Sequence, residues 1–151
     1  MMMTSGHICS RDVVSATRET TVQEAARLMR RHHVGTVVVV EKAAGINKPV
    51  GIVTDRDIVI EVTAVDLDPN VLTVGDIMSS ELASVHESEG LLPTLEIMRL
   101  KGVRRLPVTD AMGHLVGIVS IDDLLEPLTA QVTEMTRIVG HERQREIETR
   151  R

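Results

Sequence analysis

Apolar residues form short continuous runs along the chain, and these runs predict strands. Residues 36–40 and 50–53 are almost wholly apolar and rich in β-branched side chains, which is typical of buried strands. Residues 12–16 predict a shorter strand that precedes both. The turn between the two longer strands is marked by Gly45, Asn47 and Pro49. We therefore expect a small sheet in the first third of the chain.

Apolar residues at helical spacing separate these strands. One helical stripe is formed by Val22, Ala25, Ala26 and Met29. Thr20 is predicted to cap this helix, because Gln23 follows three residues later as in a capping box. A shorter helix is predicted over residues 55–62. This part of the chain thus has the order strand, helix, strand, strand, helix.

The same order of elements occurs twice. Residues 6–10 align with residues 75–79 at an offset of 69, and residues 50–54 align with residues 116–120 at an offset of 66. The first copy carries three extra residues in the loop between its long strands, where insertions are tolerated. The predicted domains are a first repeat over residues 6–65, a linker over residues 66–74 and a second repeat over residues 75–127.

Pro93 locates the start of the helix in the second repeat. Proline is tolerated in the first turn of a helix but not beyond it, so this helix is predicted to begin near Glu89 or Gly90.

Residues 128–151 form a charged tail with helical spacing. Its apolar residues on one face are Leu128, Val132, Met135 and Val139, after which Gly140 interrupts the pattern. We expect a helix that docks on the body of the protein and ends in a solvated segment. A helix that binds a partner protein is the alternative.

The composition excludes several classes of protein. The 151 residues include no Phe, Tyr or Trp and carry a net charge of −5, so we do not expect nucleic-acid binding by base stacking or by phosphate attraction. No apolar run approaches the roughly 20 residues of a membrane helix, and residues 1–6 do not resemble a signal peptide. Cys9 is the only cysteine. These features favour the cytoplasm.

Metal binding is not expected either. His32 and His33 are adjacent but have no third ligand at a recognisable spacing, and no cysteine pair is present. The acidic residues Asp66 and Asp68 lack the glycine and glutamate of a calcium loop.

A repeated motif carries the candidate chemistry. Residues 51–57 (Gly-Ile-Val-Thr-Asp-Arg-Asp) and residues 117–123 (Gly-Ile-Val-Ser-Ile-Asp-Asp) each predict a strand that ends where a helix begins. The free N–H groups and the positive end of such a helix suit a phosphate, and the hydroxyl of Thr54 or Ser120 adds a hydrogen bond. Asp57 and Asp123 are placed to accept hydrogen bonds from a ribose diol.

The alternative for this motif is a capping box without a ligand. Glu or Gln is the usual capping partner, whereas both copies here have Asp, and the motif recurs after equivalent strands. Both features favour ligand binding.

The element order, the two motifs and the phrase Gly-Val-Arg-Arg-Leu-Pro-Val at residues 102–108 resemble a tandem pair of cystathionine-β-synthase (CBS) domains. Such a pair is called a Bateman module, and this chain is most similar to the small stand-alone bacterial type, over residues 6–127. The resemblance implies an α+β fold in which two β-α-β-β-α repeats pack with pseudo-twofold symmetry and leave two clefts. It also implies a homodimer that regulates a client protein and is not an enzyme.

The resemblance further implies an adenosine-type ligand. AMP, ADP or ATP is expected, S-adenosylmethionine and NAD are further candidates, and no cofactor is required. Thr54, Ser120 and an arginine at position 104 or 105 would meet phosphate. Asp57 and Asp123 would meet the ribose, and Arg56 and Asp122 would lie beside the ligand. The adenine would lie near Val14, Ser15, Ala16, Ser84 and Val85.

The first repeat departs from this pattern. It has Gly35 and Thr36 where the second repeat has Arg104 and Arg105, so the site of Ser120 is expected to suit phosphate better. The site of Thr54 would be empty, bind a less phosphorylated ligand, or borrow a cation from the other repeat. A dimeric interaction module that needs no ligand is the alternative function.

Overall fold

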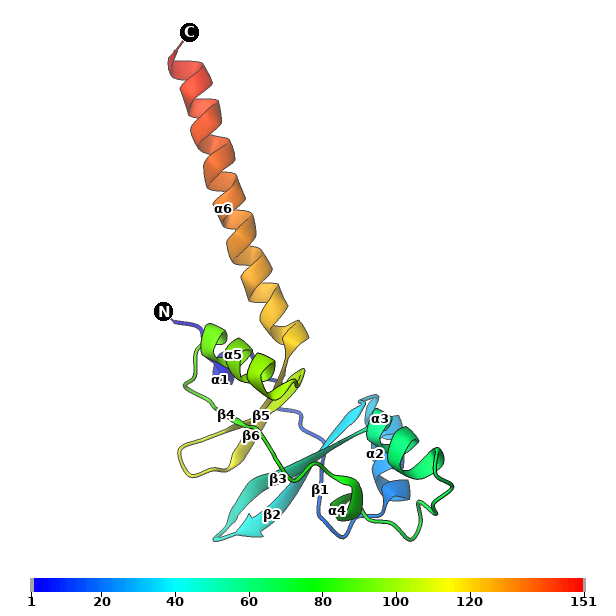
Figure 1. Ribbon diagram of the computed structural model, residues 1–151. Coiled ribbons are helices and arrows are strands. Elements are labelled where there is room, and N and C mark those ends of the chain that lie inside the picture. The colour runs from blue at the N-terminus through cyan, green and yellow to red at the C-terminus, as the bar shows by residue number, and fades with distance from the viewer. Residues whose placement is uncertain (1, 151) are drawn as a thin grey trace.

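The computed structural model describes residues 2–150 as two similar α+β halves from which one long helix projects (Figure 1). The first half contains α1 (Ser5–Ile8), β1 (Ser15–Ala16), α2 (Val22–His32), β2 (Thr36–Ala43), β3 (Ile46–Thr54), α3 (Asp55–Ile58) and the π-helical turn η1 (Val59–Thr63). The second half contains α4 (Val74–Ile77), β4 (Val85–His86), α5 (Leu91–Lys101), β5 (Arg105–Thr109), β6 (Leu115–Ser120) and α6 (Ile121–Thr149). The last residue of the predicted tail, Arg151, lies outside the described residues.

Each half has a three-stranded sheet with the same topology. The sheet orders are β1-β2-β3 and β4-β5-β6, with the first pair of strands parallel and the second pair antiparallel. Each sheet has its own apolar core, in which Val37 and Leu106 are fully buried at equivalent positions. The predicted α+β fold of two repeats is confirmed. Aliphatic and methionine side chains fill both cores without any aromatic ring.

Several predicted boundaries differ from the structure. β2 and β3 are longer than predicted, so Pro49 lies inside β3 and the turn is confined to Ala44 and Gly45. A register shift between Val39 and Val40 lies beside Pro49, which has no N–H for a regular ladder. β1 has only two residues. The helix of the second repeat begins after Gly90, as predicted.

The N-cap of α2 is Thr21, one residue after the predicted cap. Its hydroxyl accepts a hydrogen bond from the N–H of Glu24, and the Glu24 carboxylate accepts one from the N–H of Thr21. The N–H of Val22 donates to the carbonyl of Leu72, in the segment that joins the two halves. A contact distant in sequence therefore fixes the helix start, and local spacing did not reveal it.

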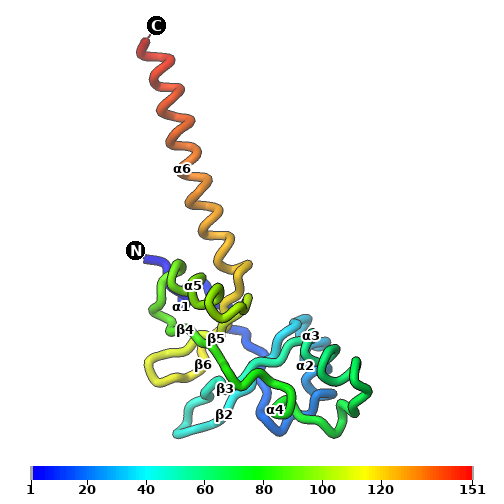
Figure 2. The backbone as a smooth tube through the Cα atoms, in the orientation of Figure 1, coloured from blue at the N-terminus to red at the C-terminus, as the bar shows by residue number. Residues whose placement is uncertain are grey.

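The two halves exchange their leading segments. α1 lies on the second half, where Ser5 N and Gly6 N donate to the carbonyls of Glu89 and Glu87, and the hydroxyls of Ser5 and Thr94 form a fully buried hydrogen bond of 2.6 Å. α4 lies on the first half, where Val74 N and Gly75 N donate to the carbonyls of Thr20 and Arg18. The tube in Figure 2 shows the N-terminal segment beside α5 and β4. Each half is thus completed by the chain of the other.

The helix α6 corrects the prediction for the tail. Its base is anchored by Leu124, which is fully buried, but every described residue from Thr129 onward is exposed. The helix also continues through Gly140 without a break. It therefore projects away from the body instead of docking on it (Figure 1). No helix within residues 2–150 is both long enough and apolar enough to cross a membrane.

The only cysteine is held in the contact between α1 and β6. A Cβ placed on Gly117 would come within 2.5 Å of the Cys9 sulfur, and the thiol donates to the carbonyl of Gly6 at 3.7 Å. Burial raises the pKa of the Cys9 thiol above its ordinary value, and the nearby Arg11 offsets this only in part.

We expect slow alkylation of Cys9 by iodoacetamide in the folded protein at pH 7.5, because the thiolate is the reactive form and burial disfavours it. The rate, followed by mass spectrometry, should rise at least tenfold in urea. A Cys9→Ser, Thr133→Cys variant provides an exposed thiol as the control. Equal rates for the two thiols in folded protein would contradict the prediction.

Candidate functional site

Two clefts lie where the two halves meet. The larger, of about 460 Å³, is called the Thr54 cleft, and its lining residues are Gly35, Thr36, Ile52, Thr54, Asp55, Arg56, Ser79, Glu81, Leu82, Ala83, Gly102, Val103, Arg104 and Arg105. The smaller, of about 290 Å³, is called the Ser120 cleft, and its lining residues are Ser10, Asp12, Val13, Val14, His33, Val34, Gly35, Thr36, Arg105, Ile118, Ser120 and Asp123. Both volumes are close to or within the usual size of small-molecule sites.

Each cleft combines the motif of one repeat with the leading loop of the other. The Thr54 cleft is closed by residues 79–83, which follow α4, and the Ser120 cleft is closed by residues 10–14, which follow α1. Backbone hydrogen bonds hold these loops in place, from Ser79 N to the carbonyl of Ile52 and between Ser10 and Ile118 in both directions. This reciprocal arrangement is what a twofold relation between the halves produces.

Thr36 and Arg105 form the wall between the clefts, because each lines both of them. They occupy equivalent positions: Thr36 lies opposite Thr54 in the first sheet, and Arg105 lies opposite Ser120 in the second. A side chain at this position therefore lines both the cleft that contains the motif of its own repeat and the cleft that contains the motif of the other repeat.

The cations gather in the Thr54 cleft, contrary to the expectation that the arginine pair would serve Ser120. Arg56, Arg104 and Arg105 line it, against the carboxylates of Asp55 and Glu81. Within residues 2–150 none of these three guanidinium groups forms a hydrogen bond or an ion pair. Arg104 and Arg105 of the second repeat thus lie where the first repeat could borrow a cation, which was one of the three possibilities left open for this site.

The Ser120 cleft has the opposite balance of charge. Arg105 and His33 are its basic residues, and Asp12 and Asp123 are its acidic ones. Arg104 is absent from its lining. A highly charged phosphate ligand is therefore better matched by the Thr54 cleft.

Both motifs form capping boxes, so the use of Asp in place of Glu did not distinguish a site from a cap. Thr54 N donates to Asp57 Oδ2 at 2.8 Å and Asp57 N donates to Thr54 Oγ1 at 3.2 Å. In the second repeat, Ser120 N and Ser120 Oγ donate to Asp123 Oδ2 at 2.7 and 2.8 Å. Each aspartate thus keeps Oδ1 as the oxygen not used in its cap.

The start of α3 offers few free N–H groups, contrary to the sequence prediction. Asp55 N donates to the carbonyl of Gly35, Arg56 N to the Asp55 side chain and Asp57 N to Thr54 Oγ1. The helix itself has only four residues. The guanidinium groups, rather than the helix start, are the positive groups of this cleft.

Some predicted site residues lie outside both clefts. Asp57 and Asp122 are not lining residues, and Ala16 and Val85 are buried in the two cores. The predicted contacts at Ser15 and Ser84 are exposed and also absent from both linings. Val14, which was also predicted beside the adenine, does line the Ser120 cleft.

Sequence reasoning missed the loop residues that close the clefts. Asp12 and Val13 align with Glu81 and Leu82 at the offset of 69, and each pair lines its own cleft. The recurrence of an acidic residue followed by an apolar one, just before the first strand of each repeat, could have identified these loop residues from the sequence.

Thr36 has an unusual environment. The residue is only 8% exposed, and its hydroxyl is the one buried side-chain polar atom among residues 2–150 that has no hydrogen-bond partner. Burying a hydroxyl without a partner costs about 1–3 kcal/mol. Thr36 lines both clefts, so this unpaired hydroxyl lies within the wall between them. The described part of the chain contains no group of three or more His, Cys, Asp or Glu that could hold a metal ion.

The geometry is that of a tandem module whose two repeats jointly form paired ligand clefts. A sequence model of the CBS domain family matches residues 6–64 and 74–129. The chain therefore belongs to the CBS domain family, as a tandem pair. Pairs of CBS domains are regulatory modules, typically not catalytic, and some bind adenosine ligands.

Known proteins support this assignment. The chain is 37% identical over 121 residues to the uncharacterised protein MK0525 of Methanopyrus kandleri, a match that covers 80% of this chain and 60% of that protein. A protein with CBS domains from Burkholderia ambifaria has a similar structure, with 28% identity and a TM-score of 0.74 over 85% of this chain and 95% of that one.

The cytosolic domain of the Mg²⁺ channel MgtE, determined in complex with ATP, is also similar. It is 26% identical, with a TM-score of 0.69, and the match covers 82% of this chain and 48% of that chain.

Proposed function

We propose that this protein is a regulatory module that binds an adenine nucleotide in the Thr54 cleft and thereby changes its affinity for a client protein. The observation that carries the proposal is the group of three unpaired arginines, Arg56, Arg104 and Arg105, in a cleft of about 460 Å³. Guanidinium groups suit phosphate because they donate two parallel hydrogen bonds. The similarity to an MgtE domain determined with ATP supports the same class of ligand.

The apolar lining of this cleft suits the adenine ring. Three separate segments contribute aliphatic side chains to it: Ile52, the pair Leu82 and Ala83, and Val103. The Thr54 hydroxyl accepts from Asp57 N and retains its own proton for donation to a phosphate oxygen. In the Ser120 cleft, we propose that Asp123 Oδ1 accepts a hydrogen bond from a ribose hydroxyl.

The nucleotide class is tested by calorimetry with ATP, ADP, AMP, NAD and S-adenosylmethionine. We expect ATP and ADP to bind more tightly than S-adenosylmethionine, because their phosphates would meet the arginines and S-adenosylmethionine has no phosphate. Since the chain has no Tyr or Trp, absorbance near 260 nm of the purified protein also reports a carried nucleotide directly. Absence of binding by all five compounds at millimolar concentration would overturn the proposal.

We further propose that the module is a cytoplasmic homodimer. Large apolar side chains on the outer helices are exposed in the single chain, and they include Val59, Ile60, Leu92 and Leu100. A second copy would cover such surface. Light scattering at micromolar concentration should give twice the mass of the chain, and a monomer would contradict this.

A ligand-independent interaction module is the second candidate, because the projecting helix α6 is a contact surface that needs no nucleotide. The two candidates differ in one observable. A regulatory module captures its client differently with and without nucleotide, whereas a constitutive one does not.

Thr36→Val is expected to stabilise the free protein and weaken nucleotide binding. Valine has nearly the same shape and removes the unpaired hydroxyl, which should raise the free energy of unfolding by about 1 kcal/mol. Loss of a hydrogen bond to the ligand should weaken binding about 3- to 10-fold. Urea unfolding followed by circular dichroism and calorimetry measure the two effects.

Thr109→Val is the matched control, because Thr109 ends β5 and lines neither cleft. It should leave nucleotide affinity unchanged. Equal behaviour of the two variants would show that the Thr36 hydroxyl does not face the ligand.

A further inference from the structure

Arg105 lies in the wall between the two clefts, on the face of its sheet that points away from the second core. Successive side chains of a strand point to opposite faces of the sheet. Leu106 and Val108 are buried in the core of the second half, so Arg105 points to the opposite face, where it lines both clefts. Thr36 has the corresponding position in the first sheet, because Val37 is buried in the first core. Both side chains therefore enter the space between the two sheets.

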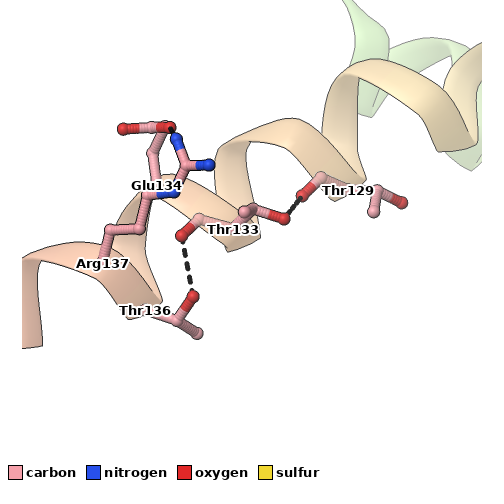
Figure 3. Close-up of polar contacts among 5 residues, drawn as sticks. All are labelled: Thr129, Thr133, Glu134, Thr136 and Arg137. Atoms are coloured by element: carbon pink, nitrogen blue, oxygen red, sulfur yellow. Dashed lines mark hydrogen bonds and ion pairs between the residues drawn. The ribbon is translucent and has the colours of Figure 1, made fainter. Parts of the chain in front are cut away.

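The guanidinium group of Arg105 has no partner in the part of the chain that the structure describes. Arginines on the helices find one on the next turn, as Arg137 of α6 does with Glu134 at 2.6 Å (Figure 3). Arg105 instead follows Arg104 in the sequence and lies opposite Ser120 in the sheet, and neither can neutralise it. Its charge is therefore available to a ligand in either cleft.

Two ligands would compete for this one group. The bidentate geometry of a guanidinium serves one phosphate at a time. The Thr54 cleft also holds Arg56 and Arg104, so a phosphate ligand is expected to bind there first and to engage Arg105. Arg105 is the one arginine among the described residues that line the Ser120 cleft. A second phosphate ligand would then enter the Ser120 cleft without its arginine.

We propose that Arg105 couples the two clefts negatively, so that a phosphate ligand in the Thr54 cleft lowers the affinity of the Ser120 cleft for another. The effect is reciprocal, because a coupling free energy acts equally on both sites. The module would consequently respond to one nucleotide over two separate ranges of concentration. This inference rests on the proposed binding of nucleotide in the Thr54 cleft and describes its regulation.

Occupancy of the two clefts can be followed separately, because the chain has no tryptophan of its own. Val103 and Val34 align at the offset of 69, and Val103 lines the Thr54 cleft whereas Val34 lines the Ser120 cleft. Both side chains are exposed, which leaves room for a larger one. Val103→Trp and Val34→Trp thus place one fluorescent ring in each cleft, where a bound adenine changes its emission.

The test is a fluorescence titration of Val34→Trp with ATP, with and without the cations that serve the Thr54 cleft alone. Removing those cations, as Arg56→Ala with Arg104→Ala, weakens the Thr54 cleft and leaves Arg105 to the Ser120 cleft. We expect the ATP midpoint of the Ser120 cleft to fall about 10-fold, as expected for one regained hydrogen bond to a charged group. Loss of two positive charges would by itself weaken the binding of an anion, so tighter binding distinguishes the coupling.

Two further comparisons show whether Arg105 carries the effect. Arg99→Ala with Lys101→Ala removes the same charge from α5, outside both clefts, and should not lower the midpoint. In an Arg105→Ala background the midpoint should be the same with and without Arg56 and Arg104, because the shared group is gone. Circular dichroism confirms that each variant is folded.

A lower midpoint that requires Arg105 supports the proposal. An unchanged or higher midpoint overturns it, and so does a decrease that persists in Arg105→Ala or a Val34→Trp signal that never responds to millimolar ATP. Titration of Val103→Trp separates this failure from failure of the proposed function. If Val103→Trp responds to ATP and the Ser120 midpoint does not shift, nucleotide binding stands and only the coupling is wrong. If Val103→Trp does not respond, both are wrong.

Discussion

Arg104→Ala is expected to weaken ATP binding roughly 10- to 100-fold while leaving the fold intact. The side chain lines only the Thr54 cleft and has no partner in residues 2–150, so its removal leaves no buried group unpaired. A hydrogen bond to a charged group contributes about 1.5–3 kcal/mol, which corresponds to this loss of affinity. Calorimetry with ATP and with adenosine measures it, and adenosine should lose much less because it has no phosphate.

Arg99→Ala is the matched control for Arg104→Ala. Arg99 lies on α5 outside both clefts and pairs only with the exposed Glu96. Arg105→Ala adds a second comparison, because Arg105 lines both clefts and its loss should affect ligands of both. Unchanged ATP affinity in Arg104→Ala, with binding by the parent protein, would place the phosphates elsewhere.

Leu106→Ala is expected to destabilise the protein by about 2–5 kcal/mol, a large part of the 5–15 kcal/mol typical of a folded domain. Leu106 is fully buried in β5 at the centre of the second core. Its truncation removes apolar contacts and leaves a cavity that the surrounding strands cannot fill. Because the chain has no Trp, urea unfolding should be followed by far-ultraviolet circular dichroism.

Leu100→Ala is the control for Leu106→Ala, because it makes the same leucine-to-alanine truncation at an exposed position. Leu100 is 67% exposed on α5, so its truncation should change the free energy of unfolding by less than about 0.5 kcal/mol. Similar losses for the two leucines would contradict the assignment of Leu106 to the core.

The fold could be predicted largely from the sequence because its repeat is visible there. The Val-Gly-Ile-Val strands and their following hydroxyl residues align without ambiguity, and the strands they predict are present as β3 and β6. Helix starts were less secure. Thr20 and Thr21 are each followed three residues later by a capping partner, and contacts distant in sequence, such as the bond from Val22 N to Leu72 O, accompany the choice of Thr21.

The site was predicted less completely, because its residues meet across the two halves. Arg105 lies opposite Ser120 in its own sheet, so sequence order assigns the arginines to Ser120. The packing of β3 beside β6 and the exchange of leading segments instead bring Arg104 and Arg105 to Thr54. The tail was misplaced for a different reason: an apolar face at helical spacing looks the same whether the body or another chain covers it.

The exchange of α1 and α4 between the two halves bears on whether the chain must be continuous. A cut in the segment that joins the two halves would give two fragments, and each would carry a short helix that belongs to the other. The first fragment would keep α1 without the buried Thr94 hydroxyl that its Ser5 meets, and the second would keep α4 without its contact to Thr20. We therefore expect two such fragments to reassemble without the covalent connection, because the crossed helices α1 and α4 still specify how the halves fit together.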